Sequence, residues 1–189
     1  MSGRGTIAGV GRALARGAAS RRSGPRWSAA TALAVLTAAI AVTLVTPPAP
    51  RLVWNVSASA PRGLYAVTPG ATASRGEMVI ARVPLAWRRL AAVRRYIPEN
   101  VPLVKRVAAG AGDRVCAVGA DIRVNGRRVA TRRALDGQGR AMPAWSGCVT
   151  LAPGTLFLLM DAPESFDGRY FGPTSHGDII GKARLIWRA

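Results

Sequence analysis

Cysteine, histidine, lysine and acidic residues are all scarce in this chain of 189 residues, which holds two cysteines, one histidine and nine acids. So few soft ligands, with no zinc spacing, exclude the usual metal-binding modules, and we expect neither a metal nor a cofactor. Only two of the 27 basic residues are lysines, and the arginines are spread along the chain. Without a basic zipper or an aromatic RNA-binding strand, the net charge of +18 does not predict a nucleic-acid partner.

Acidic residues are missing from the first 27 residues, which carry six arginines. Residues 28–45 then contain no charged side chain, and two prolines follow soon after. An apolar run of this length, at about 1.5 Å per residue, just spans a hydrocarbon core of about 30 Å, and flanking arginines stay cytoplasmic. We predict a cytoplasmic basic tail (1–27), one transmembrane helix (28–46) and a periplasmic domain (50–189).

The apolar run has two other interpretations. A cleaved signal peptide also places charge before an apolar segment, but its apolar segment is shorter and ends at a small-residue cleavage site rather than at prolines. A buried core helix fits poorly because the run is apolar on every face. We favour an uncleaved single-pass anchor in the inner membrane, with the signal peptide as the alternative.

The two cysteines, Cys116 and Cys148, agree with an exported domain. In an oxidising compartment they could form a disulfide that closes a loop of about 33 residues and contributes about 3 to 4 kcal/mol. Two unrelated buried thiols are the alternative.

The pattern beyond residue 50 is mainly β. Apolar and polar side chains alternate around Asn125-Gly126, which is a strong signal for a two-residue hairpin. Residues 84–97 instead place apolar residues between arginine pairs in a helix-like spacing. Two further strands are predicted, over residues 76–83 and 154–161.

Two serines separated by one residue occur in the stretch NVSASAPRGLY, residues 55–65. A serine needs a base to become a nucleophile, and that base is most often histidine. The only histidine, His176, lies in a PTSHGD loop, where an ordinary exposed loop residue is the simpler interpretation. A Ser-His-Asp triad stays open, but a lysine is the better candidate for the base.

Lys105 lies in the stretch VPLVKRVA. If residues 101–107 form a strand, Leu103, Lys105 and Val107 share one face, and an ammonium between apolar neighbours is desolvated. Lowering a lysine pKa from about 10.4 to near 7 takes about 4 to 5 kcal/mol, which burial can supply. The neutral amine could then accept a serine proton. The alternative is a lysine whose amine reaches the surface.

A third set of polar residues lies in PESFDGRYFGP, residues 163–173. Ser165, Asp167 and Arg169 stand at i, i+2 and i+4, so that an extended segment would point all three the same way. The aspartate and arginine could pair, and Ser165 could aim the lysine amine. An ordinary surface turn with a weak salt bridge is the alternative.

The order of these stretches resembles the type I signal-peptidase superfamily, and more closely the TraF-type proteases of conjugative transfer systems. The closer similarity rests on the Ser-x-Pro-x-Gly-Leu-Tyr form around Ser59, on RRYIPENVPLVKRVAA and on the two cysteines. The Ser-Met-x-Pro box of ordinary signal peptidases is absent. The resemblance covers residues 50–188 and implies a signal-peptidase-like β catalytic domain behind one N-terminal transmembrane helix. It also implies a Ser-Lys dyad, with Ser59 as nucleophile and Lys105 as general base.

The same resemblance assigns supporting roles. Ser57 matches the position whose hydroxyl joins the Ser59 backbone N–H in an oxyanion hole. Ser165 matches the serine that positions the lysine, and Asp167 and Arg169 match the supporting salt bridge.

Two positions depart from the family pattern. Gly168 stands where a serine is usual, and Met160 stands where a glycine is common. Neither position is assigned direct chemistry, so the departures bear on local geometry.

The resemblance implies cleavage of an exported precursor, a pilin or another conjugative transfer component, by acyl transfer at the inner membrane and next to the transfer machinery. The product could be trimmed or cyclised. A general signal peptidase with housekeeping substrates, and a non-catalytic membrane-anchored scaffold of a secretion complex, are the alternatives. A self-cleaving repressor is disfavoured because no DNA-reading helical module is present.

Overall fold

The computed structural model describes residues 28–45 and 48–189, and the chain divides into two units, 1–47 and 48–189. In the first unit, helix α1 (Ala29–Val45) forms within the predicted membrane segment 28–46. Within the described ranges, no helix is long and apolar enough to cross a membrane. The membrane anchor therefore stays a prediction, and the predicted basic tail lies outside the described residues.

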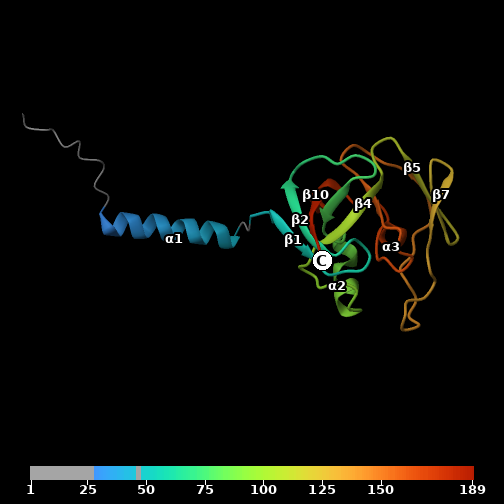
Figure 1. Ribbon diagram of the computed structural model, residues 1–189, viewed down its shortest axis with the longest axis horizontal. Helices are drawn as coiled ribbons and strands as arrows, with labels where there is room; N and C mark the ends of the chain where they lie inside the picture. Colours follow the sequence, from blue (N-terminus) through green and yellow to red (C-terminus); the bar gives the residue numbers. More distant parts are fainter. Residues whose placement is uncertain (1–27, 46–47) are drawn as a thin grey trace, which may run out of the picture. The chain divides into compact units, whose positions relative to one another are not determined.

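The second unit is mainly β, as predicted, and its larger sheet has six antiparallel strands (Figure 1). Their order is β1-β2-β10-β3-β4-β9, so that β4 pairs on both sides. The predicted strands 76–83 and 154–161 are confirmed by β3 and β9. The bounds are β1 (Leu52–Asn55), β2 (Gly63–Pro69), β3 (Met78–Ala81), β4 (Leu103–Ala109), β9 (Phe157–Leu159) and β10 (Ile179–Arg188).

The smaller sheet has four antiparallel strands in the order β7-β6-β5-β8. Asn125 and Gly126 join β6 to β7 with φ values of 51° and 82°. Both residues are thus left-handed, as a two-residue turn between twisted strands requires, and the predicted hairpin is confirmed. The bounds are β5 (Arg114–Val118), β6 (Asp121–Val124), β7 (Arg127–Thr131) and β8 (Gly147–Thr150).

Strand β4 runs through the densest part of the core. It starts after Pro102, which has no N–H to donate to a neighbouring strand. Val107 packs with Val79, Ala81 and Leu158 in a cluster that excludes solvent almost completely. Leu103 and Val104 are also buried, in two other clusters, whereas the Arg106 side chain is 40% exposed. The fully buried face of β4 is the one that carries Leu103, Lys105 and Val107.

The predicted helix over 84–97 is shorter in the structure, where α2 covers Leu85–Val93. Arg95 adopts a φ of 60°, which a helix cannot continue through, and Pro98 follows. Residues of α2 and of the turn after it pack against an aromatic cluster that includes Phe166 and Tyr170. The helix therefore helps to cover the segment that carries Ser165 and Asp167.

Asp167 and Arg169 form an ion pair, as the sequence suggested, although the segment that carries them is not extended. Asp167 is the N-cap of a short helix, α3 (Gly168–Phe171), and its Oδ1 accepts the Arg169 N–H at 3.1 Å. This local hydrogen bond turns the chain into a helix, and it brings Asp167 and Arg169 together without strand alternation. A 3₁₀ turn, η1 (His176–Asp178), comes before β10.

Cys116 and Cys148 form a disulfide, which removes the alternative of two unrelated thiols. The two cysteines lie opposite each other in the register of β5 and β8. The bond therefore holds together two strands that are separated in sequence by the β6–β7 hairpin and the segment after it.

We expect the double variant Cys116→Ser/Cys148→Ser to lose about 3 to 4 kcal/mol of unfolding free energy, because the unfolded chain regains the closed loop's entropy. Denaturant unfolding of the full chain in detergent measures this. The parent protein under reducing conditions should unfold at the midpoint of the variant. Equal stability of the oxidised parent and the variant would contradict the prediction.

Gly168 lies where α3 meets β9, and the structure explains why it departs from the family serine. A Cβ atom there would lie 2.8 Å from the Leu158 carbonyl oxygen and 2.9 Å from the Phe157 ring. We expect Gly168→Ser to lower the unfolding free energy by about 1 to 3 kcal/mol. Gly137→Ser is the matched control, because a Cβ at Gly137 meets nothing within 4 Å. Equal denaturation midpoints for the two variants would contradict this account.

Candidate active site

Ser59 lies on the exposed loop between β1 and β2, which we call the nucleophile loop (residues 56–62). Its hydroxyl lies 2.9 Å from the Ser57 hydroxyl. Its backbone N–H donates to Ser57 Oγ at 3.2 Å. The two serines of the NVSAS stretch therefore form one connected group.

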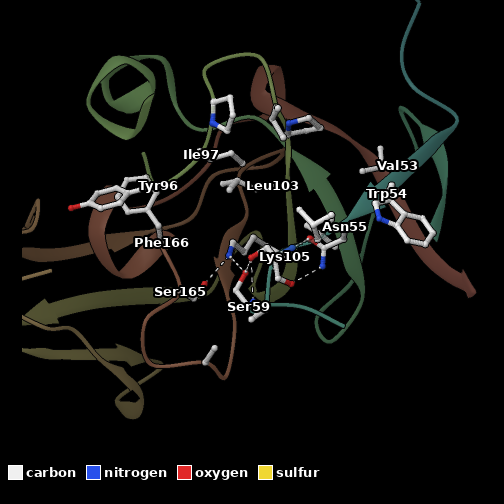
Figure 2. A pocket seen from close by; sticks show the side chains of 18 of the residues that line it. Val53, Trp54, Asn55, Ser59, Tyr96, Ile97, Leu103, Lys105, Ser165 and Phe166 are labelled. Carbon is white, nitrogen blue, oxygen red and sulfur yellow. Dashed lines mark hydrogen bonds between the residues drawn. The ribbon is translucent and has the colours of Figure 1, made fainter. Parts of the chain in front are cut away.

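Lys105 reaches this group from the middle of β4 (Figure 2). Its Nζ lies 3.0 Å from Ser59 Oγ and 2.7 Å from Ser165 Oγ. The residue is only 2% exposed, so the predicted burial is confirmed and a surface-reaching amine is excluded. Burial lowers the pKa of Lys105 to about 8; the Asp167 carboxylate raises it and the Arg169 guanidinium lowers it further.

A strongly lowered lysine pKa beside a hydroxyl is the arrangement that serine activation needs. A neutral amine has one lone pair to accept a proton and two N–H groups to donate. Ser59 and Ser165 lie at hydrogen-bond distance from that amine. The site therefore holds a potential nucleophile, a potential base and a group that aims the base.

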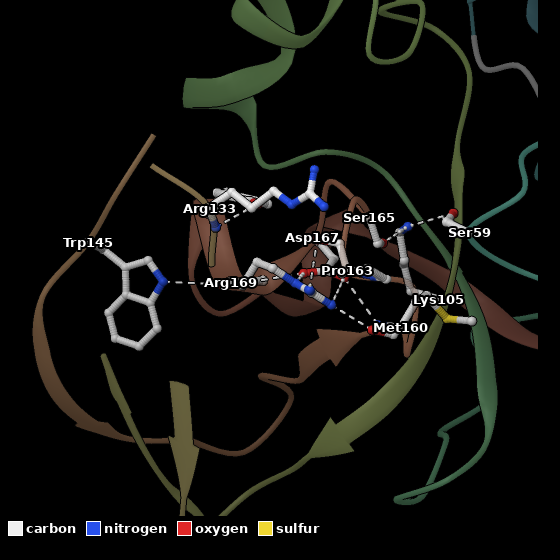
Figure 3. A network of polar contacts seen from close by, with 11 residues as sticks. Ser59, Lys105, Arg133, Trp145, Met160, Pro163, Ser165, Asp167 and Arg169 are labelled. Atoms are coloured by element: carbon white, nitrogen blue, oxygen red, sulfur yellow. Dashed lines mark hydrogen bonds and ion pairs between the residues drawn. The ribbon is translucent and has the colours of Figure 1, made fainter. Parts of the chain in front are cut away.

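Asp167 and Arg169 form a buried ion pair behind Ser165 (Figure 3), at 0% and 2% exposure. Asp167 Oδ1 lies 2.8 Å from Arg169 Nε. Arg169 also donates to the carbonyl oxygens of Met160 and Pro163. These bonds satisfy much of the pair's hydrogen-bonding capacity, which a buried charge requires, and they fix the segment that presents Ser165.

The departure at Met160 is explained by the same network. Met160 contributes only main-chain atoms to it: its N–H donates to Asp167 Oδ2, and its carbonyl accepts from Arg169. Its side chain packs in the core cluster with Ala60 and Tyr65. A side chain at this position is therefore compatible with the ion pair.

His176 does not join the site. It lies in η1 and lines a second cavity together with Arg75 and Asp113. The hydrogen-bonding partner that Ser59 meets across the fold is Lys105, and the geometry does not support a triad with His176. In the part of the chain that the structure describes, no group of three or more histidine, cysteine or acidic side chains could hold a metal ion.

The reactive group opens into a cavity of about 640 Å³ (Figure 2). Ser59, Lys105 and Ser165 are its polar centre, and most of the remaining wall is apolar. Such a surface suits small or apolar side chains of an extended peptide. The apolar lining includes Val53, Trp54, Ile97, Val101, Leu103 and Phe166.

Sequence reasoning missed Asn55, the last residue of β1. Its side chain is 7% exposed and hydrogen-bonds to the backbone of the nucleophile loop at four points. The available signal was an asparagine two residues before Ser57, where its side chain can mimic a backbone turn.

Comparison with known proteins adds the family. The sequence model described as "Signal peptidase, peptidase S26" matches residues 25–188. "Conjugal transfer protein TraF" of Agrobacterium fabrum is 34% identical over 143 residues, which are 70% of this chain and 80% of that protein. "Probable conjugal transfer protein TraF" of Sinorhizobium fredii is 34% identical over 145 residues, 70% of this chain and 74% of that protein.

A solved signal peptidase I from Enterococcus faecalis aligns with 59% of this chain and 96% of its own, at 18% identity and a TM-score of 0.35. So limited a similarity supports no conclusion. The family match and the TraF relatives each cover well over half of the chain. This chain therefore belongs to the signal peptidase S26 family, as a TraF-type member with a peptidase-type function.

Proposed function

We propose that this protein is a serine endopeptidase that cleaves exported precursor proteins by acyl transfer through a Ser59–Lys105 dyad. The observation that carries the proposal is the buried Lys105 amine, at hydrogen-bond distance from both Ser59 and Ser165. Its pKa of about 8 means that Lys105 is neutral in a fraction of the molecules near physiological pH. Ordinary lysines are almost fully charged there and cannot act as bases.

In the acylation step, neutral Lys105 accepts the proton of the Ser59 hydroxyl while Ser59 Oγ attacks the peptide carbonyl carbon. A C–O bond forms, and the carbonyl π electrons move onto oxygen. Collapse of this intermediate breaks the C–N bond, and the Lys105 ammonium gives its proton to the leaving amine. Ser165 accepts a hydrogen bond from the amine and keeps it aimed at Ser59.

The oxyanion would be held by the Ser59 N–H and the Ser57 hydroxyl. In the structure the Ser59 N–H donates to Ser57 Oγ, and the Ser57 hydroxyl lies 2.9 Å from Ser59 Oγ. A bound carbonyl oxygen would replace that internal bond, and rotation of the Ser57 hydroxyl would point its proton at the oxyanion.

Deacylation requires a second nucleophile. Neutral Lys105 would take a proton from water as the water oxygen attacks the acyl carbon. The ester C–O bond to Ser59 then breaks, the Lys105 ammonium returns the proton to Ser59 Oγ, and the trimmed product leaves with a free carboxyl group. A substrate amine in place of water would give an amide, and an amine of the same chain would give a cyclic product.

For the substrate, we propose a pilin or another exported transfer component, presented at the periplasmic face of the inner membrane by its own apolar segment. The relatives' names, conjugal transfer proteins, support this choice. So does the apolar cavity wall beside Ser59. A general signal peptidase would use the same chemistry on ordinary secretory precursors. A scaffold would need neither Ser59 nor Lys105.

The dyad predicts that Ser59→Ala and Lys105→Ala each lower precursor processing by about 10⁴-fold or more, because nucleophile and base act as a unit. Processing is measured in membranes that contain the full-length protein and a co-expressed pilin precursor. His176→Ala is the control and should process at the parental rate. Loss of processing in His176→Ala with activity retained in Lys105→Ala would overturn the dyad.

Two further measurements distinguish the proposed peptidase from a general signal peptidase and from a scaffold. Equally fast cleavage of ordinary secretory precursors would favour the general signal peptidase. Conjugative transfer that needs the protein but is insensitive to both dyad substitutions would favour the scaffold.

The lowered pKa of Lys105 predicts the pH dependence. The neutral amine is the active form, and its fraction grows as pH rises through about 8. We therefore expect kcat/KM to rise about tenfold per pH unit below that midpoint and to level off above it. Initial rates on a short precursor peptide between pH 5.5 and about 9.5 measure the profile. A midpoint near 6.5 that disappears in His176→Ala would instead identify a histidine base.

A further inference from the structure

The nucleophile loop has few backbone hydrogen bonds of its own. It leaves β1 after Asn55 and reaches β2 at Gly63. Among the described residues, the only backbone–backbone hydrogen bond that this loop makes outside the strands runs from the Ala189 N–H to the Arg62 carbonyl. The loop that carries Ser57 and Ser59 must therefore be held by side chains.

The Asn55 side chain holds the loop at both ends. Its Nδ2 donates to the carbonyl oxygens of Ser57, Ala60 and Pro61 at 3.0, 3.1 and 3.0 Å. Its Oδ1 accepts the Ser57 N–H at 3.1 Å. An amide has only two N–H groups, so three acceptors share them, and the loop is curled around one buried side chain.

The contacts lead directly to the reacting groups. Asn55 fixes both the N–H and the carbonyl of Ser57, and the Ser57 hydroxyl then accepts the Ser59 N–H. The Ser57 hydroxyl and the Ser59 N–H are the two groups proposed to bind the oxyanion. Within the described residues, the Asn55 side chain makes no hydrogen bond to Ser59 Oγ or to Lys105, so it can act only through the loop.

We propose that Asn55 is the positioning residue of the nucleophile loop: its amide sets the place of the Ser59 N–H and the Ser57 hydroxyl relative to the Lys105 amine. The inference rests on the proposed function of Ser59. A second bond, from the Tyr65 hydroxyl to the Pro61 carbonyl at 2.9 Å, holds only the far end of the loop. Tyr65 therefore cannot replace Asn55 at Ser57.

The chemistry requires an amide at this position. An aspartate of the same shape keeps the acceptor for the Ser57 N–H but loses both donors, and it turns an oxygen toward three carbonyl oxygens. An alanine loses all four bonds and leaves the buried Ala60 carbonyl without its Asn55 donor, whereas the Pro61 carbonyl keeps the Tyr65 hydroxyl.

We expect Asn55→Asp and Asn55→Ala to lower kcat by about 10²-fold, since displaced oxyanion donors act like absent ones. KM should change less than about threefold, because the apolar cavity wall is intact. The pH midpoint of Asn55→Ala, which adds no charge, should stay at the parental value. A shifted midpoint would mean that Lys105 has moved, and it would overturn a role confined to the loop.

Two asparagine variants provide controls. Asn125→Ala removes the hydrogen bonds to Asp113 and Arg114 in the smaller sheet, so that it also loses stability but should keep the parental kcat. Asn100→Asp makes the same chemical change as Asn55→Asp, but at an exposed position, and it should keep the parental kcat. If Asn125→Ala lowers kcat as much as Asn55→Ala does, general destabilisation explains the loss and the inference falls.

A measurement independent of activity separates this inference from the proposed function. Amide hydrogen exchange, in the full chain carrying Ser59→Ala, should speed up over residues 56–62 when Asn55→Ala is added, with the strands unchanged. Unchanged exchange in the loop would overturn the inference. If Ser59→Ala processes precursor like the parent, the proposed function fails. If Ser59→Ala is inactive while Asn55→Asp keeps the parental kcat, only the positioning role fails.

Discussion

The site depends on one physical constraint: a lysine amine is kept almost completely out of water between two serine hydroxyls. Burial makes the charged form costly and lowers the pKa of Lys105 to about 8. Strand β4 supplies that burial because it is paired on both sides and because the face that carries Lys105 is buried from Leu103 to Ala109. A lysine on an edge strand could reach water and would stay charged, so that it could not accept a proton.

Two rigid attachments give the amine its partners. On one side, the buried Asp167–Arg169 pair holds the segment that presents Ser165, and its two charges act in opposite directions on Lys105. On the other side, the Asn55 amide holds the loop that presents Ser59. Both attachments are made by satisfied buried polar groups, which have few alternative arrangements and so favour a single geometry.

The predictions from sequence held where local chemistry decides structure. Asn125-Gly126 formed its hairpin because both residues adopt left-handed φ values readily. Sequence patterns were less informative where a segment could adopt either an extended or a helical backbone. An extended segment would have placed Arg169 beside Asp167, but Asp167 caps a helix there, and the cap brings the same two side chains together.

The mainly β class, the resemblance to TraF-type signal peptidases and the candidate residues Ser59, Lys105 and Ser165 follow from local patterns and motifs in the sequence. Contacts between distant segments were needed to show that Lys105 meets Ser59 and Ser165 rather than water, that Cys116 faces Cys148, that a side chain at 168 would clash, and that Asn55 holds the nucleophile loop. Burial and hydrogen-bond partners come from strands far apart in sequence, and no local pattern encodes which of them meet.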